Sequence, residues 1–414
     1  MTTFELIALL FTVTAVAGYV NHRYVRLPNA IGLMAMSLVI SLVLVTLGKF
    51  GGFDTETIRA LVTRLDFSNV LMHGMLSFLL FAGALHVNLA ELRKVRVTVT
   101  LLATCGVMIT VFIVGTLIWL AAGWLGVPLS YYFALLFGAL IAPTDPIAVL
   151  GILKNAKVSR QLYMKIGGES MFNDGTGVAV FVIILSMATT AHEPSVFDVG
   201  MLLGREIFGG LGLGCLLGWL TYMLIHSIDE YKVEVLLTLA LVTGGYALAE
   251  TLHVSAPIAM VMAGLIVGNH GREQGMSKLT RERLDVFWEL LDEILNALLF
   301  MMIGLEIIIV AMTWPGLALG VLAILIVLMG RFISVASMIY LTRLWRKDFD
   351  RGTVALLTWG GLRGGLSIAM ALSLPNGAEK DLILEITYIV VVFSIMVQGT
   401  TFGRVIRWAT APKA

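Results

Sequence analysis

The sequence predicts an all-helical protein that crosses a membrane many times. Of its 414 residues, 58% are hydrophobic and 13% are charged, whereas about a quarter of the residues in a soluble domain are charged. The mean hydropathy is +0.94, and the apolar residues gather in runs long enough for a helix to cross a bilayer. With a net charge of +1, nothing in the composition favours a nucleic-acid partner. We therefore expect an all-α polytopic membrane protein, with residues 1–414 forming one transmembrane unit.

The apolar runs number about thirteen, and each is a candidate membrane span. The first, FELIALLFTVTAVAGYV, lacks a preceding basic segment and an obvious cleavage site, so we expect it to be retained. The eighth and ninth runs lie close together, but His253 and Ser255 between them favour a break. The charged stretch 269–285 is expected to be a solvated connection. The approximate limits of the runs are 4–20, 30–47, 67–87, 97–121, 131–153, 166–188, 206–225, 235–250, 255–268, 286–310, 316–342, 352–373 and 383–403.

The basic residues of the loops predict the orientation of the chain. Of the 28 Lys and Arg residues, 21 lie in one set of alternate loops and five lie in the opposite set. This asymmetry predicts a multi-pass membrane protein with a cytoplasmic C-terminus and an N-terminus outside. The two basic residues that remain, Arg331 and Arg363, fall inside apolar spans.

The fifth span carries a signal for a broken helix. It reads ALIAPTDPIAVL, in which Pro143 and Pro146 flank Asp145. Each proline lacks an N–H and clashes with the carbonyl four residues earlier. The carbonyls of Ala139 and Ala142 should therefore leave the helical ladder, and freed carbonyls of this kind can bind a cation.

The twelfth span carries a second signal of the same kind. It reads TWGGLRGGLSIAM, where two glycine pairs weaken the helix around Arg363. The fifth and twelfth spans are seven apart, so they run in opposite directions. An inverted repeat of spans 1–6 and 8–13 gives this relation, and such repeats with broken helices at the midplane recur in transporters.

The sixth span begins with a polar cluster, GGESMFNDGTGVAVF. Glu169 and Asn173 are four residues apart, as are Ser170 and Asp174, so each pair lies along one face of a helix. Oxygen-only ligands of this kind suit a hard cation such as Na⁺.

The three acids of these spans, Asp145, Glu169 and Asp174, outnumber the two buried arginines. An ionised carboxylate at the centre of a bilayer costs about 2.5 kcal/mol or more unless it is paired or hydrated. We expect one acid to pair with an arginine, which leaves carboxylates that have to bind a cation or a proton. The residues therefore predict a cation/proton exchanger, and the alternative is a closed polar network that only holds the helices together.

The motifs also support a family resemblance that covers most of the chain from about residue 70. APTDPIAVL together with GGESMFNDGTGVAVF resembles the paired signature of the monovalent cation/proton antiporters, including NhaP-type and eukaryotic sodium/proton exchangers. The similarity continues through LAETLHVSAPIAMVMAGLIVGNHG, FWELLDEILNALLFMMIGLEI and WGGLRGGLSIAMALSLP. Five motifs in order are much more specific than any one of them.

The resemblance implies roles for the residues that match the family motifs. Asp174 is expected to bind the cation or the proton, and Asp145, Thr144 and Ser170 are expected to supply further ion ligands. Asn173 is expected to hold the site together, and an Asn at this position resembles the electroneutral branch of the family.

Further roles concern the charged residues around that site. Glu169 is expected to form a core salt bridge, with Arg331 as the preferred partner and Arg363 as the second choice. Glu250 is either an accessory ion or proton group or an interfacial acid. Relatives often carry an acid in the segment that reads FLLFAGALHV here, but this chain has Ala82 and Gly83, which weakens any ion role for that segment.

The resemblance implies a fold as well. We expect about 13 transmembrane helices, with spans 5 and 12 unwound where they cross. Helices in 1–96 and 206–285 would form a dimerisation or scaffold domain, and those in 97–190 and 316–408 would form the ion-binding core. The expected partners are a monovalent cation, the proton, the lipid bilayer and a second copy of the chain in a homodimer.

The predicted function is electroneutral exchange of Na⁺ or Li⁺ for H⁺ by alternating access, with no cofactor and no enzymatic reaction. Three alternatives remain open. The same fold could exchange K⁺ for H⁺, because the sequence indicates no size filter. A Na⁺-coupled symporter of an organic solute shares the architecture but needs a larger cavity. An intramembrane aspartyl protease also needs two membrane aspartates, but Arg331 and Arg363 would then have no role.

Overall fold

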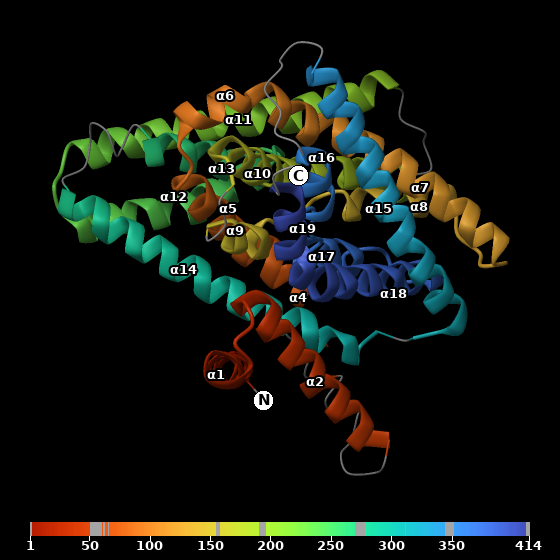
Figure 1. Cartoon of the computed structure of the whole chain (residues 1–414). Helices are drawn as coiled ribbons and strands as arrows, with labels where there is room; N and C mark the ends of the chain where they lie inside the picture. Colours follow the sequence, from red (N-terminus) through yellow and green to blue (C-terminus); the bar gives the residue numbers. More distant parts are fainter. Residues whose placement is uncertain are drawn as a thin grey trace.

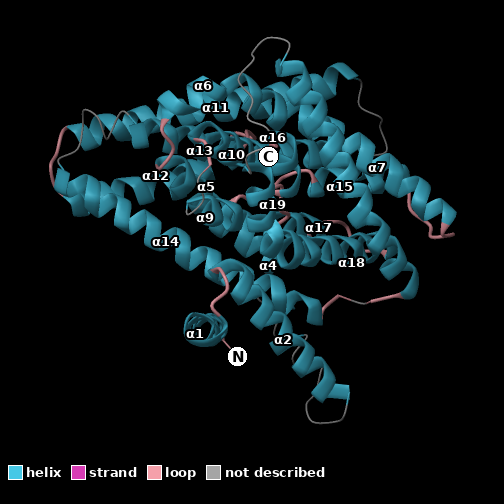
Figure 2. Ribbon diagram, viewed as in Figure 1, coloured by secondary structure: helices cyan, strands magenta, loops and turns pink. Residues whose placement is uncertain are grey.

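A computed structural model of the chain describes residues 2–49, 60, 63–64, 66–154, 158–189, 196–269, 278–310, 312–343 and 352–410. The regular secondary structure of these residues is helical, and turns and loops connect the helices (Figures 1 and 2). The described part contains no strand of a sheet, and its isolated β-bridge joins Asp145 to Leu362. The prediction of an all-α fold is therefore confirmed.

The helices of the N-terminal half follow the predicted apolar runs, and several extend beyond them. Short π-helical segments lie after α1, before α5 and between α6 and α7. The bounds are α1 Thr3–Val20, α2 Asn29–Lys49, α4 Phe67–Asn69, α5 Leu76–Leu85, α6 Leu89–Leu101, α7 Val107–Trp124, α8 Tyr131–Ile141, α9 Ile147–Lys154 and α10 Arg160–Thr189.

The helices of the C-terminal half complete the bundle. A 3₁₀ turn at Glu306–Ile308 follows α14, and a π-helical segment at Ser394–Gly399 joins α18 to α19. The bounds are α11 Val196–His226, α12 Tyr231–Thr251, α13 Ala256–Ile266, α14 Lys278–Leu305, α15 Trp314–Arg343, α16 Thr353–Trp359, α17 Gly365–Leu372, α18 Ala378–Phe393 and α19 Thr400–Thr410.

Nine helical segments of the described chain are long and apolar enough to cross a membrane, so the protein is a multi-pass membrane protein. The other four predicted runs fall on helices of a different kind. These are the interrupted pairs α8/α9 and α16/α17, the short apolar α13, and α14 with its charged residues. The count of thirteen spans therefore stays a prediction.

Two boundaries differ from the sequence-based expectation. The basic residues Arg93, Lys94 and Arg96 lie within α6 and not in a loop. The expected connection 269–285 is also wrong in part, because α14 begins at Lys278. The reason in both cases is that charged residues at the end of a span can continue its helix into the polar region outside the bilayer.

Between α12 and α13 the helix is interrupted at the place where His253 and Ser255 favour a break. Ser255 caps the N-terminus of α13 by accepting a hydrogen bond from the Ile258 N–H.

The helices pack into two main neighbourhoods. In one, α7 lies against α8 and α15, α15 lies against α18, and α10 crosses α8 and α6. In the other, α13 lies between α5 and α11, while α14 packs on α2. Figure 1 shows α14 running obliquely across the molecule, with α1 and α2 on its lower side and the blue C-terminal helices beside it. Large apolar side chains such as Phe208 and Leu325 are exposed on the outer surface, as lipid-facing positions require.

Candidate ion-binding site

The two interrupted helices meet at their breaks. α8 ends at Ile141 and α9 begins at Ile147, whereas α16 ends at Trp359 and α17 begins at Gly365. Within these gaps the Asp145 N–H donates to the Leu362 carbonyl at 2.8 Å. The prolines on one side and the glycines on the other remove helical hydrogen bonds, so the two non-helical segments can satisfy each other. Irregular backbone at membrane depth requires such protection.

Glycine allows the close approach of the two segments. A Cβ atom at Gly364 would collide with the carboxyl group of Asp145. A Cβ atom at Gly177 of α10 would collide with the ring of Pro143. The glycines that weaken α16/α17 therefore also make room for Asp145, and the glycine-rich start of α10 lets that helix pack directly on the break.

Arg363 occupies the end of the first half-helix. Its Nη1 donates to the Ala142 carbonyl at 2.7 Å and to the Pro143 carbonyl at 2.8 Å, and its side chain is fully buried. A cation there is favourable, because a helix C-terminus carries partial negative charge. The carbonyls of Ala139 and Ala142, which were expected to be free for a cation, are therefore both engaged within the protein. Arg363 takes the Ala142 carbonyl, and the Ala139 carbonyl accepts the Ala142 N–H.

Glu169 and Arg331 form a buried two-pronged ion pair between α10 and α15. Nη2 of Arg331 lies 2.8 Å from Oε2 of Glu169, and Nη1 pairs with Oε1. Arg331 also donates to the Leu357 carbonyl of α16. Such paired, bidentate geometry is what a buried charge requires. The pair therefore joins α10, α15 and the last turns of α16, while Arg363 has a different set of partners.

The polar residues of α10 and the α8/α9 break form one hydrogen-bonded network. The Thr144 hydroxyl lies 2.9 Å from that of Ser170 and accepts from Asn173 Nδ2 at 2.9 Å. Asn173 Oδ1 accepts from the Thr144 backbone N–H at 3.3 Å. All three side chains are buried. The structure thus brings together these three residues, which the sequence places in two different spans.

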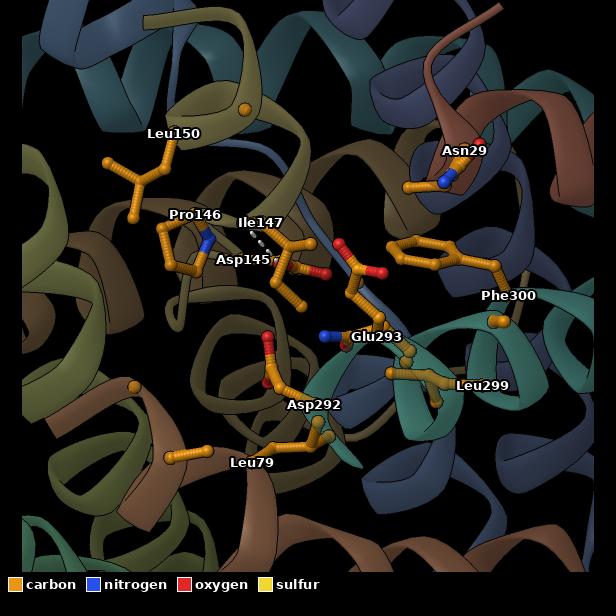
Figure 3. Close-up of a pocket in the computed structure, with 18 of the residues that line it drawn as sticks. Asn29, Leu79, Asp145, Pro146, Ile147, Leu150, Asp292, Glu293, Leu299 and Phe300 are labelled. Atoms are coloured by element: carbon orange, nitrogen blue, oxygen red, sulfur yellow. Dashed lines mark hydrogen bonds between the residues drawn. The ribbon is translucent and has the colours of Figure 1, made fainter. Parts of the chain in front are cut away.

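Asp145 and Asp174 differ from Glu169, because no ion pair joins either of them to a basic side chain in the described chain. Asp145 Oδ1 accepts from the Ile147 N–H at 2.9 Å, a contact drawn as a dashed line in Figure 3. Asp174 lies one turn after Ser170 on α10, and both aspartates line the same cavity. They are carboxylates with few fixed donors.

The cavity has a volume of about 1540 Å³ and lies between α1, α2, α5, α9, α10, α14 and α17. Five acidic side chains line it, and no Lys or Arg of the described residues does. Three of the acids come from α14, namely Glu289, Asp292 and Glu293. In Figure 3 the side chains of Asp145, Asp292 and Glu293 face this space. Sequence reasoning missed the α14 residues. The available signal was their i, i+3, i+4 spacing within FWELLDEILN, which puts them on one helix face.

Glu250 lies apart from these residues. It does not line the cavity, and its Oε1 is 3.3 Å from Nε2 of His73. Both side chains are about half exposed. The structure therefore groups eight of the nine candidate residues around the two helix breaks and leaves Glu250 outside.

The comparisons with known proteins agree with this architecture. The family described as sodium/hydrogen exchanger, transmembrane, matches residues 9–408. The Na⁺/H⁺ antiporter NhaP of Pseudomonas aeruginosa is 49% identical over 97% of this chain and 96% of its own. The Na⁺/H⁺ antiporter NhaH of Halobacillus dabanensis is 35% identical, with the same two coverages.

A solved structure supports the fold independently of close sequence similarity. The sodium proton antiporter MjNhaP1 from Methanocaldococcus jannaschii at pH 8 superposes with a TM-score of 0.77 at 18% identity, and the match covers 100% of both chains. Because the family match spans nearly the whole sequence, the chain belongs to the transmembrane sodium/hydrogen exchanger family.

Proposed function

We propose that the chain is a secondary active antiporter that exchanges Na⁺, or Li⁺, for H⁺ across the plasma membrane. The observation that carries this proposal is the pair Asp145 and Asp174, two carboxylates without a basic partner in the described chain that line one large cavity. The names of the NhaP and NhaH relatives support the same exchange.

The chemistry follows from the cost of burying charge. A carboxylate inside a membrane protein is unfavourable unless a counter-charge or a proton neutralises it. Asp174 and Asp145 would accept either a cation or a proton, with the hydroxyls of Thr144 and Ser170 as further oxygen ligands. Because a cation and a proton compete for the same carboxylates, loading one releases the other.

Alternating access would convert this competition into transport. The core, residues 97–190 and 316–408, would move against the scaffold, residues 1–96 and 206–285, only when the carboxylates are neutralised. The non-helical segments of α8/α9 and α16/α17 would be the crossing point of the inverted repeat. The scaffold would also make the homodimer, and the protein would serve pH homeostasis.

Electroneutral exchange is the stoichiometry that Asn173 favours. Its amide is engaged with Thr144 and has no proton to release at physiological pH. Glu169 is held by Arg331. The exchangeable charge therefore comes from Asp145 and Asp174, and the resemblance of Asn173 to the electroneutral branch supports the exchange of one cation for one proton. The N-terminus would lie outside and the C-terminus in the cytoplasm.

The test is Na⁺-induced dequenching of a pH-sensitive dye in everted membrane vesicles. The wild-type chain should respond to Na⁺ and Li⁺, and Asp174→Asn should not. Asp381→Asn, the same change at an exposed position of α18, is the matched control and should respond as wild type does. A full response from Asp174→Asn would contradict the assignment of Asp174.

The two transport alternatives are decided by the composition of the medium. Replacing Na⁺ by K⁺ in proteoliposomes identifies a K⁺/H⁺ antiporter. A Na⁺-coupled symporter needs a large cavity, and one exists here. If Na⁺ drives proton movement in liposomes that contain no organic solute, obligatory symport is excluded. Clamping the membrane voltage at zero and then varying it tests electroneutrality, because an electroneutral rate does not change.

A further inference from the structure

Helix α14 presents a polar stripe to the cavity. Glu289, Glu293 and Asn296 follow one another at i, i+4 and i+7, and all three line the cavity. This spacing places them on one face of the helix. Asp292 lines the same wall, and it and Glu289 both have interactions of their own. In a helix otherwise packed through apolar residues such as Trp288 and Leu298, this stripe needs an explanation.

Asn296 has an unsatisfied oxygen. Its side chain is only 6% exposed, and Oδ1 is buried without a hydrogen-bond partner among the described residues. Leaving a buried polar atom unpaired costs about 1–3 kcal/mol, and such atoms usually indicate a ligand, an ion or an ordered water. The residue lines the cavity, so an ion or a water of the cavity can supply the partner.

The charged residues of the cavity wall indicate whether the partner of Asn296 is a cation or an anion. Asp145, Asp174, Glu289, Asp292 and Glu293 line it, and the described residues contribute no Lys or Arg to its wall. His22 and His86 also line it, and Nε2 of His86 lies 3.9 Å from Asp285 of α14. A concave surface with low-dielectric walls and one sign of charge concentrates the opposite ion. The occupant is therefore a cation, and an amide oxygen is a suitable ligand for a hard one.

The stripe leads toward the aspartates. Leu299 of α14 packs on Gly365, the first residue of α17, and the preceding Gly364 touches the Asp145 carboxyl. Asn296 lies three residues before Leu299, and Glu293 lies three before Asn296, so each step outward is about 4.5 Å along the helix axis. Figure 3 shows Glu293 projecting from α14 on the side of the cavity where Asp145 lies. Glu293 and Asn296 therefore lie at successive distances from Asp145 along α14, and they do not form one cluster with it.

We propose that Glu293 and Asn296 of α14 form an outer cation-binding subsite, at which Na⁺ is partly dehydrated before it reaches Asp145 and Asp174. Glu293 supplies the charge, and Asn296 supplies a fixed oxygen ligand. The inference rests on the proposed function, because it concerns how the transported cation reaches the inner residues. The subsite raises the occupancy of the inner residues at low Na⁺ and takes no part in proton release.

The first experiment separates binding from turnover in everted vesicles, which expose the cytoplasmic side to added Na⁺. Glu293→Gln should raise the apparent KM for Na⁺ about fivefold, which corresponds to ~1 kcal/mol, and leave the maximal rate unchanged. High ionic strength should raise the KM of the wild type and reduce the difference between the two proteins, because salt screens Glu293. Glu282→Gln makes the same change at an exposed position of α14 outside the cavity, and its KM should equal that of wild type.

Substitutions of Asn296 test the oxygen ligand separately from the charge. Asn296→Leu keeps the approximate volume and removes the oxygen, so the KM should rise while the melting temperature in detergent stays the same or increases. Asn296→Asp keeps an oxygen and adds a charge. Its apparent KM for Na⁺ at low ionic strength should therefore be equal to that of wild type or lower. A reduced maximal rate with unchanged KM in Glu293→Gln and Asn296→Leu would overturn the proposal.

A direct test uses Tl⁺ as the probe in crystals of the full-length protein. The proposal expects two anomalous peaks, one beside Asp145 and Asp174 and one beside Glu293 and Asn296, with the outer peak missing in Glu293→Gln. An inner peak alone in the wild type would contradict the outer subsite and leave the proposed function intact. If the wild type shows no Na⁺-driven proton movement at all, the proposed function itself fails.

Discussion

Two groups of carboxylates in the core of this protein differ in how many fixed donors they have: Glu169 and Glu385 are buried, whereas Asp145 and Asp174 are partly exposed to the cavity. Glu169 is held by both Nη atoms of Arg331. Glu385 of α18 accepts from the Thr313 backbone N–H at 2.7 Å and from the Thr313 hydroxyl at 2.9 Å, at the start of α15. Among the described residues, Asp145 accepts one backbone N–H and Asp174 has no ion pair.

The difference explains why similar residues have different expected roles. A carboxylate with a complete set of donors is stable when ionised and holds helices together. A carboxylate without such donors has to obtain its neutralising partner from the cavity. The number of permanent donors, rather than burial alone, separates a structural acid from an exchangeable one, and substitutions can test this.

The largest effect is expected for the exchangeable acids. Asp145→Asn and Asp174→Asn should each lower Na⁺/H⁺ exchange at least about 100-fold, because a neutral amide can neither bind a proton nor attract a cation. Neither should lower the melting temperature in detergent. Added Na⁺ should stabilise the wild type by about 2.7 kcal/mol at a hundred times its dissociation constant, and this stabilisation should be absent from both variants. Equal Na⁺ stabilisation of Asp174→Asn would argue against its role.

The next effect concerns the structural pair of the core. Glu169→Gln should lower the free energy of unfolding by about 3–5 kcal/mol, because it leaves Arg331 buried without a counter-charge. The measurement is unfolding in detergent, with the double variant Glu169→Gln/Arg331→Met as control. The double variant should recover much of the lost stability. If Glu169→Gln is as stable as wild type, the ion pair with Arg331 does not stabilise the fold, and Glu169 is not a structural acid.

A smaller effect is expected at the second structural acid. Glu385→Gln should cost about 1–3 kcal/mol of stability, because one oxygen that accepts a hydrogen bond from Thr313, the residue that caps α15, is replaced by a donor. Exchange measured at a temperature well below unfolding should keep the wild-type KM for Na⁺. A changed KM would place Glu385 with the exchangeable group.

The smallest effect is expected for Glu250. Its partner His73 is half exposed, and exposed ion pairs contribute below about 1 kcal/mol. Glu250→Gln should therefore change stability by less than this amount and the apparent KM for Na⁺ by less than about twofold. A pH profile of exchange recorded beside that of wild type checks the result. A shifted profile would favour the accessory proton role that the sequence left open.

Local sequence signals predicted much of the site. The i, i+4 spacing predicted that Ser170 shares a helix face with Asp174, and Glu169 with Asn173. The prolines around Asp145 predicted the break between α8 and α9. These features depend on neighbours within a few residues, and helical geometry and backbone sterics determine them directly. The excess of acids over arginines likewise indicated that some carboxylates lack a permanent partner.

Only the tertiary structure decided which partners meet across the chain. It placed Arg331, and not the second candidate Arg363, on Glu169, 162 residues away. It placed Arg363 on the carbonyls of Ala142 and Pro143, of which that of Ala142 was expected to be free for a cation. It also turned the polar stripe of α14, including Glu293 and Asn296, toward the cavity. The physical reason is that periodicity fixes which residues share a helix face, whereas the packing of distant helices fixes what that face contacts.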